Sequence, residues 1–182
     1  MRFYRLLDDV QIPERWHLGT VRSDLGDTPP LRTAVPCVRT ALSSDVRAGH
    51  RALDFSLTSL AVPVLSRSLA ETIRNECRND AEFLPLEIPG HEGFVVLNVL
   101  RVEPCIDEAR SEFLKWTTRD HRPELAGSYR QVTDLRLDRS RIPSDAQVFR
   151  LEGWEIALIV SEKVKDLMMS VNCVGASFHD VC

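Results

Sequence analysis

Long hydrophobic runs are missing from this sequence of 182 residues. No stretch approaches the roughly 18 uninterrupted apolar residues that a membrane-spanning helix needs. Residues 1–9 hold only short apolar pairs before a double acid, which is too little for the hydrophobic region of a secretory signal. We therefore expect a cytoplasmic protein with no membrane partner.

The five cysteines and five histidines show no metal-binding pattern. No two cysteines form a C-x-x-C pair, and their odd number and wide spacing argue against a zinc site or a disulfide framework. No two histidines fall at H-x-x-x-H or H-E-x-x-H spacing. Glycine-rich loops that cradle phosphate and the G-x-S-x-G turn of hydrolases are also absent. The sequence thus predicts no metal, no other cofactor and no catalytic residue.

The charge balance argues against one class of partner. With 23 basic and 27 acidic residues the formal net charge is −4, so the chain lacks the positive charge with which proteins neutralise nucleic-acid phosphates. We expect no nucleic-acid partner. A content of 43% hydrophobic and 27% charged residues is typical of a globular domain, and the length favours a single one.

The middle of the chain contains clear strand and helix patterns. Residues 53–57 alternate between apolar and polar, as in a half-buried strand. A helix follows over residues 68–78, where Ser68 begins an S-x-x-E capping box and Ser66 is a rival cap. Two apolar runs then predict strands paired through a turn at Pro89-Gly90, namely residues 83–88 and 94–102.

The C-terminal part has the same plan. Residues 154–160 form the most apolar strand pattern, Ser161 caps a second helix, and residues 176–181 form a closing strand. The segments 63–88 and 157–181 therefore share one order of strand, serine cap, helix and strand. Either an internal duplication or a commonly recurring strand–helix–strand unit explains this similarity.

The N-terminal part is different. Prolines and glycines interrupt residues 1–50, which predicts short strands and long loops, with residues 3–6 as an edge strand. We expect residues 1–182 to form a single α+β domain, in which two to three helices pack on a largely antiparallel sheet. Residues 1–50 are then its loop-rich part.

Residues 106–116 allow two interpretations. As a helix they place Asp107, Glu108 and Glu112 on one face beside Trp116; as a turn followed by a strand, their apolar and polar residues alternate. An ordinary solvated surface is the simpler explanation for the acids. An acidic patch beside a tryptophan can also dock a basic protein, because tryptophan is frequent at interface hot spots. We take these four residues as candidate partner-binding residues.

The order and spacing of nine segments, none of them diagnostic alone, carry a resemblance that spans nearly the whole chain. They are FYRL (3–6), WHLG (16–19), LDFSLT (53–58), VPVLS (62–66), FVVLNV (94–99), CIDEARSE (105–112), VFR (148–150), GW (153–154) and ALIVSE (157–162). In these segments the chain resembles the immunity-protein family of bacterial polymorphic toxin systems, in the branch abundant in myxobacteria.

The resemblance implies a cytosolic protein encoded beside a secreted toxin, often a nuclease delivered by a type VI apparatus. Such a protein binds the toxin domain and protects the producing cell and its siblings. The family brings no catalytic residues, and its recurring Asp107 and Ser111 form either a local turn or a contact. We therefore predict a binding protein and not an enzyme; the sequence does not fix its oligomeric state.

Two alternative functions stay open. The first is a small cytosolic hydrolase that uses His121 with a carboxylate or with Cys105, which would require a deep pocket that gathers these groups. The second is a housekeeping interaction domain without a toxin partner.

Overall fold

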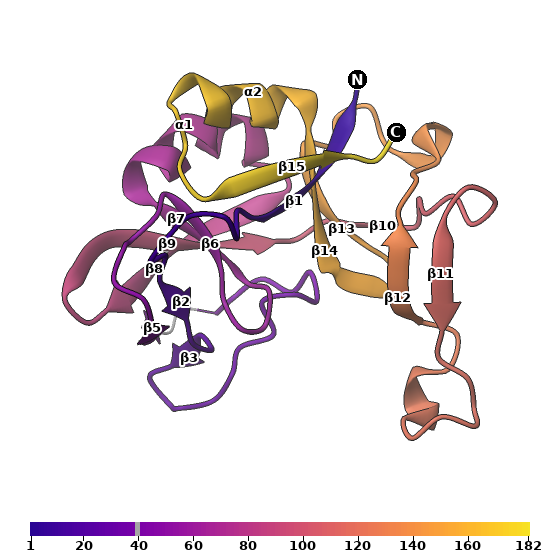
Figure 1. Ribbon diagram of the computed structural model, residues 1–182, viewed down its shortest axis with the longest axis horizontal. Helices are drawn as coiled ribbons and strands as arrows, with labels where there is room; N and C mark the ends of the chain where they lie inside the picture. Colours follow the sequence, from indigo (N-terminus) through magenta and orange to yellow (C-terminus); the bar gives the residue numbers. More distant parts are fainter. Residues whose placement is uncertain (39–40) are drawn as a thin grey trace.

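The computed structural model describes residues 1–38 and 41–182, and most strands of this part lie in two sheets (Figure 1). The five-stranded sheet has the order β10-β13-β14-β1-β15, and the six-stranded sheet has the order β3-β4-β8-β9-β7-β6. Neighbouring strands run antiparallel except in the pairs β4–β8 and β10–β13. With the two α-helices of the described residues, the protein is α+β, as the sequence predicts.

The longest described strands are β8, β9 and β14, and the others have six residues or fewer. The five-stranded sheet consists of β1 (Phe3–Asp8), β10 (Val102–Glu103), β13 (Val148–Leu151), β14 (Trp154–Ser161) and β15 (Ala176–Asp180). The six-stranded sheet consists of β3 (Arg22–Ser23), β4 (Leu42–Ser43), β6 (Phe55–Leu57), β7 (Pro63–Ser66), β8 (Ala81–Ile88) and β9 (His91–Val99). Two smaller pairs are β2 (His17–Leu18) with β5 (Val46–Ala48), and β11 (Glu112–Lys115) with β12 (Tyr129–Asp134).

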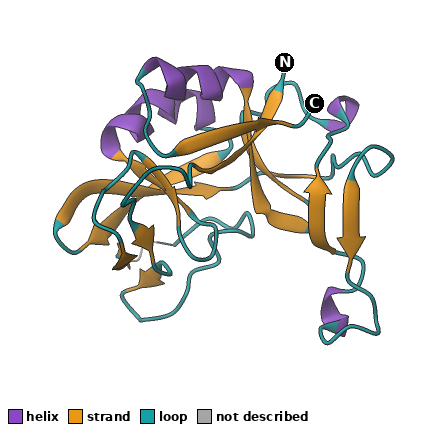
Figure 2. Ribbon diagram, viewed as in Figure 1, coloured by secondary structure: helices purple, strands orange, loops and turns teal. Residues whose placement is uncertain are grey.

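Two helices, α1 (Arg67–Cys77) and α2 (Glu162–Ser170), lie side by side on the same side of the molecule (Figure 2). The Oγ of Ser161 caps α2 as predicted, accepting the Val164 amide at 3.2 Å. In α1 the N-cap is Ser66, whose side chain accepts the Leu69 amide. The predicted capping box that begins at Ser68 is therefore wrong. The helix starts earlier because β7 continues in extended conformation only up to Ser66. Within the described residues no helix is long and apolar enough to span a bilayer.

Three hydrophobic clusters bury both faces of each sheet. Along β14, Leu158 and Val160 face the first cluster, which the two helices cover, while Ala157 and Ile159 face the second. The six-stranded sheet is likewise shared between the first and third clusters. Strands buried on both faces carry uninterrupted apolar runs, which explains why residues 157–160 are all apolar.

The N-terminal strand is not at an edge. We predicted an edge strand at residues 3–6, yet β1 pairs with β14 on one side and β15 on the other. The reason is that β15, from the other end of the chain, covers the free side of β1. In the segment that follows, Trp16 is fully buried and donates its Nε1 hydrogen to Ser56 Oγ at 2.7 Å.

The hairpin predicted around Pro89-Gly90 is confirmed. Strands β8 and β9 pair along their whole length, from Ala81 opposite Val99 to Ile88 opposite His91. This hairpin forms the centre of the six-stranded sheet.

Candidate partner-binding surface

The candidate residues belong to a hairpin that projects from the body of the protein. Strands β11 and β12 form a separate two-stranded sheet, joined by residues 117–128, which we call the tip loop (Figure 1). One face of the hairpin is anchored, because Phe113, Tyr129 and Val132 pack on the second cluster. The other face and the tip loop are free to meet another molecule.

The helical interpretation of residues 106–116 is wrong, and the alternative of a turn followed by a strand is confirmed. The Asp107 carboxylate accepts the backbone amides of Ala109 and Arg110 at 3.1 and 3.3 Å and pairs with the Arg110 guanidinium. Such side-chain acceptors compete with helix formation. The Ser111 hydroxyl donates to the Arg136 carbonyl and accepts the Arg136 amide. Asp107 thus closes a local turn, and Ser111 anchors it to the segment that follows β12.

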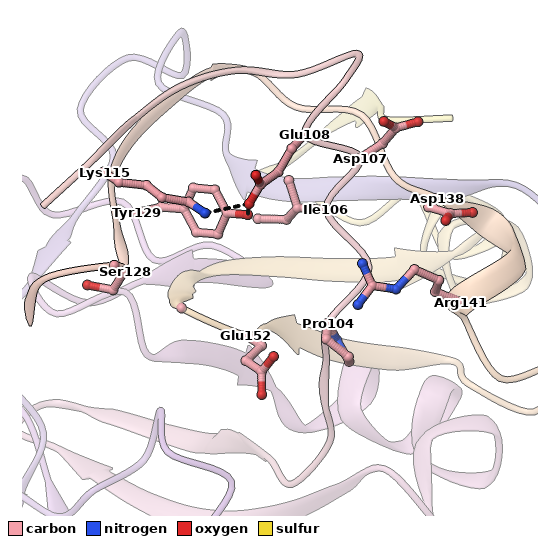
Figure 3. A pocket seen from close by; sticks show the side chains of 12 residues that line it. Pro104, Ile106, Asp107, Glu108, Lys115, Ser128, Tyr129, Asp138, Arg141 and Glu152 are labelled. Carbon is pink, nitrogen blue, oxygen red and sulfur yellow. Dashed lines mark hydrogen bonds and ion pairs between the residues drawn. The ribbon is translucent and has the colours of Figure 1, made fainter.

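Glu108 is fixed by two neighbours on the hairpin. One oxygen, Oε1, accepts hydrogen bonds from Lys115 Nζ and from the Tyr129 hydroxyl, both at 2.5 Å (Figure 3). These bonds, with Lys115 contributing most, lower the pKa of Glu108. Burial and the bond to Glu108 raise the pKa of Tyr129. At neutral pH the carboxylate is therefore charged and the phenol protonated.

The cluster borders an open pocket of about 640 Å³ between the hairpin and the turn from β13 to β14 (Figure 3). Asp107 and Glu108 line it, together with charged side chains that we did not single out from the sequence: Lys115, Asp138, Arg141 and Glu152. The sequence pattern of any one segment gives no signal for them, because they reach the pocket from three separate segments: β11, residues 138–141 and the turn from β13 to β14.

Glu112 does not join the other acids. It lies on the exposed side of β11 with Leu114, and its carboxylate accepts the Thr133 hydroxyl at 3.4 Å. The predicted single acidic face of Asp107, Glu108 and Glu112 is therefore wrong, because Asp107 and Glu108 lie in a turn and Glu112 begins a strand, whereas a helix would align all three.

Trp116 lies half-buried where β11 meets the tip loop. The guanidinium of Arg130 lies over its ring, 5.0 Å from the centroid, and the His121 ring meets it edge-on at 5.2 Å. Asp120 pairs with Arg130 at 3.5 Å and also accepts the Thr117 amide, which holds the tip loop closed. The arrangement presents an aromatic ring and an arginine together, the two side chains most enriched at interface hot spots.

The structure does not bring together the groups named for a hydrolase. Cys105 is fully buried in the second cluster, and burial raises the pKa of its thiol to about 12. His121 packs on Trp116, and neither residue lines the pocket beside Glu108. Within residues 1–38 and 41–182, no three His, Cys, Asp or Glu side chains gather as metal ligands.

Fold and surface together define an α+β protein with a projecting, rigidly anchored hairpin. The model of the immunity protein family Imm11 matches residues 55–182, which includes the whole hairpin. The chain belongs to this immunity protein family, and its function is immunity against a toxin. No curated protein matches the sequence.

Proposed function

We propose that the protein neutralises a cognate toxin by binding the toxin domain through the projecting hairpin, with Asp107, Glu108, Glu112 and Trp116 in or beside the interface. The observation that carries the proposal is the family match over residues 55–182, which contains the hairpin. The Trp116–Arg130 pair supports this location, since such residues dominate binding energy when buried between proteins.

In this proposal the toxin is a nuclease effector delivered by a type VI or related contact-dependent system. The immunity protein works in the cytoplasm of the producing cell and its siblings, and it binds neither nucleic acid nor membrane. Its net charge of −4 favours encounter with a basic nuclease domain, because complementary charge accelerates association more than it tightens the complex. Inhibition follows from covering or distorting the active site of the toxin.

We further propose that the protein is not an enzyme and that residues 1–182 form one domain. Burial of Cys105 and the position of His121 support the first point. The second is supported by contacts between distant segments: Asp8 accepts the Leu57 amide at 2.7 Å, and β1 lies between two C-terminal strands.

The proposal is tested in cells that express the toxin gene found beside the gene of this protein. Growth is expected with the wild-type protein and is expected to fail when Trp116→Ala and Arg130→Ala are combined. A matched control, Met169→Ala, changes an exposed apolar residue of α2 and should protect fully. Cells that die equally fast with and without the wild-type gene would refute the proposal.

A further inference from the structure

The two sheets contain the same arrangement of strands around their helices. In the six-stranded sheet, β6, β7, α1, β8 and β9 follow one another in the chain, and β9 lies between β7 and β8. In the five-stranded sheet, β13, β14, α2 and β15 follow in the same order, and β1 lies between β14 and β15. Strand β1 therefore takes the place of β9, although it comes from the other end of the chain.

The strands of the two units pair in the same register. Ser66 lies opposite Phe94 and Ser161 lies opposite Phe3, so a serine meets a phenylalanine in both. On the other side of the central strand, Ala81 lies opposite Val99 and Ala176 opposite Asp8. One constant spacing in sequence separates Ser66 from Ser161, Ala81 from Ala176 and Phe83 from Phe178. Equal register over three elements is more than a recurring motif requires.

The helix caps use the same bonds. The backbone amide of Ser66 donates to the Asp54 carbonyl at 2.8 Å, and that of Ser161 donates to the Gln147 carbonyl at 2.8 Å. Each serine hydroxyl then donates to the side chain of the same residue, to Asp54 Oδ1 at 2.9 Å and to Gln147 Oε1 at 2.6 Å. Asp54 and Gln147 both directly precede the outer strand of their unit, β6 or β13.

The two units also contact each other reciprocally. The turn after α1 meets the start of β13, where the Val148 amide donates to Asp80 Oδ2 at 3.2 Å. The turn after α2 meets the start of β6, where the Phe55 amide donates to the Val174 carbonyl at 3.1 Å. Glycine at position 175 permits this second contact, because a Cβ there would lie 2.2 Å from the Phe55 carbonyl oxygen.

The residues that directly follow the two central strands, β9 and β1, also make equivalent hydrogen bonds. The Leu100 amide, directly after β9, donates to the Asp80 carbonyl at 2.7 Å, and the Asp9 amide, directly after β1, donates to the Gly175 carbonyl at 2.8 Å. Contacts in which each unit offers the other the same surface define an isologous, two-fold interface.

We infer that the protein is an internal duplication folded as a pseudo-dimer, in which the N-terminal strand β1 completes the C-terminal unit. Two connecting segments break the symmetry: residues 9–54 follow β1, and residues 100–147 follow β9. The first packs in the third cluster and the second in the second cluster, on the outer faces of the two sheets. The candidate hairpin lies in residues 100–147, so the partner-binding surface is an addition to a duplicated scaffold.

A helix transplant tests the inference without any toxin. Residues 66–75 replace residues 161–170 in the full chain, which keeps a serine at the cap and places Leu69 and Ile73 at the fully buried positions of Val164 and Met168. The control transplants residues 67–76 into the same place. This shift by one residue removes the cap and puts an arginine at the position of Met168.

The inference predicts that the aligned chimaera unfolds cooperatively, with a melting temperature lowered by no more than about 10 °C, and that the shifted chimaera loses cooperative unfolding. Thermal unfolding of both chimaeras is measured by far-ultraviolet circular dichroism, and their tertiary packing by near-ultraviolet circular dichroism. Two unfolded chimaeras would show that the helices are not equivalent, and two equally stable chimaeras would show that the register carries no information. Either result overturns the inference and leaves the proposed function unaffected.

Discussion

The Arg130 guanidinium lies over the Trp116 ring, 5.0 Å from its centroid, and joins β12 to the end of β11 where the tip loop begins. The stack fixes the orientation of a half-buried aromatic ring before any partner arrives. A preorganised side chain loses little conformational freedom on binding, so more of its contact energy appears as affinity.

Trp116→Ala is expected to weaken toxin binding by about 2 kcal/mol, a roughly 30-fold rise in Kd, because it removes the aromatic ring from the proposed surface. Isothermal titration calorimetry with the purified toxin domain measures the change. Met169→Ala, which alters an exposed residue on α2, serves as the matched control. An unchanged Kd for the Trp116 variant would place the interface elsewhere.

Glu108 makes a pH-dependent contribution to stability. Bonds from Lys115 and Tyr129 lower its pKa in the folded protein, so this contribution is complete above the unfolded pKa of about 4.3 and is lost as the pH falls through the folded pKa. Glu108→Gln should therefore lower the melting temperature at pH 7, and the difference from wild type should shrink below about pH 4. Thermal unfolding over this range measures it, with Glu112→Gln as the control. A difference that stays constant down to pH 3 would contradict the assignment.

The Cys105 thiol is expected to resist alkylation in the folded protein. It is fully buried, and with a pKa of about 12 only roughly one thiol in 10,000 is ionised at pH 8. Mass spectrometry after iodoacetamide treatment should find Cys105 unmodified in native protein and modified in urea, while the half-buried Cys182 reacts sooner. Rapid modification of native Cys105 would revive the hydrolase alternative.

Asp80 connects the two sheets from a buried position. Its carboxylate accepts a hydrogen bond from the backbone amide of Gln147 at 2.7 Å and pairs with the Arg101 guanidinium at 3.1 Å. Only 1% of the residue is exposed. Asp80→Ala should cost about 3 kcal/mol of unfolding free energy, because it leaves the backbone amides of Gln147 and Val148 without their buried acceptor and removes the buried partner of Arg101. Urea denaturation measures this loss. Asp145→Ala removes an exposed partner of the same arginine and should leave the midpoint nearly unchanged.

The elements that the sequence predicts correctly are those with local signals. Ser161 and the apolar stripe after it define α2, and Pro89-Gly90 defines the turn between β8 and β9. In both cases the residues that decide the structure lie within a few positions of one another, so no distant contact overrides them.

The failures depend on distant contacts. Strand β1 is internal only because β15 pairs with it from the other end of the chain, which no local pattern in residues 3–6 reveals. Residues 106–116 satisfy helical periodicity, but Asp107 closes a turn and Ser111 bonds to Arg136, which follows β12. The candidate site shares this limit: Trp116 is identifiable by residue type, whereas its partner Arg130 is known only once β11 and β12 are paired.

If the protein acts by occupying a toxin, titration of toxin activity reveals the ratio at which the two proteins combine. Increasing amounts of the purified protein are added to a fixed amount of the neighbouring gene's toxin domain, and the toxin's own activity is followed. Stoichiometric binding predicts that toxin activity falls linearly to zero at a fixed molar ratio, with no loss of either protein. Full toxin activity at saturating immunity protein, or inhibition by far less than a stoichiometric amount, would contradict it.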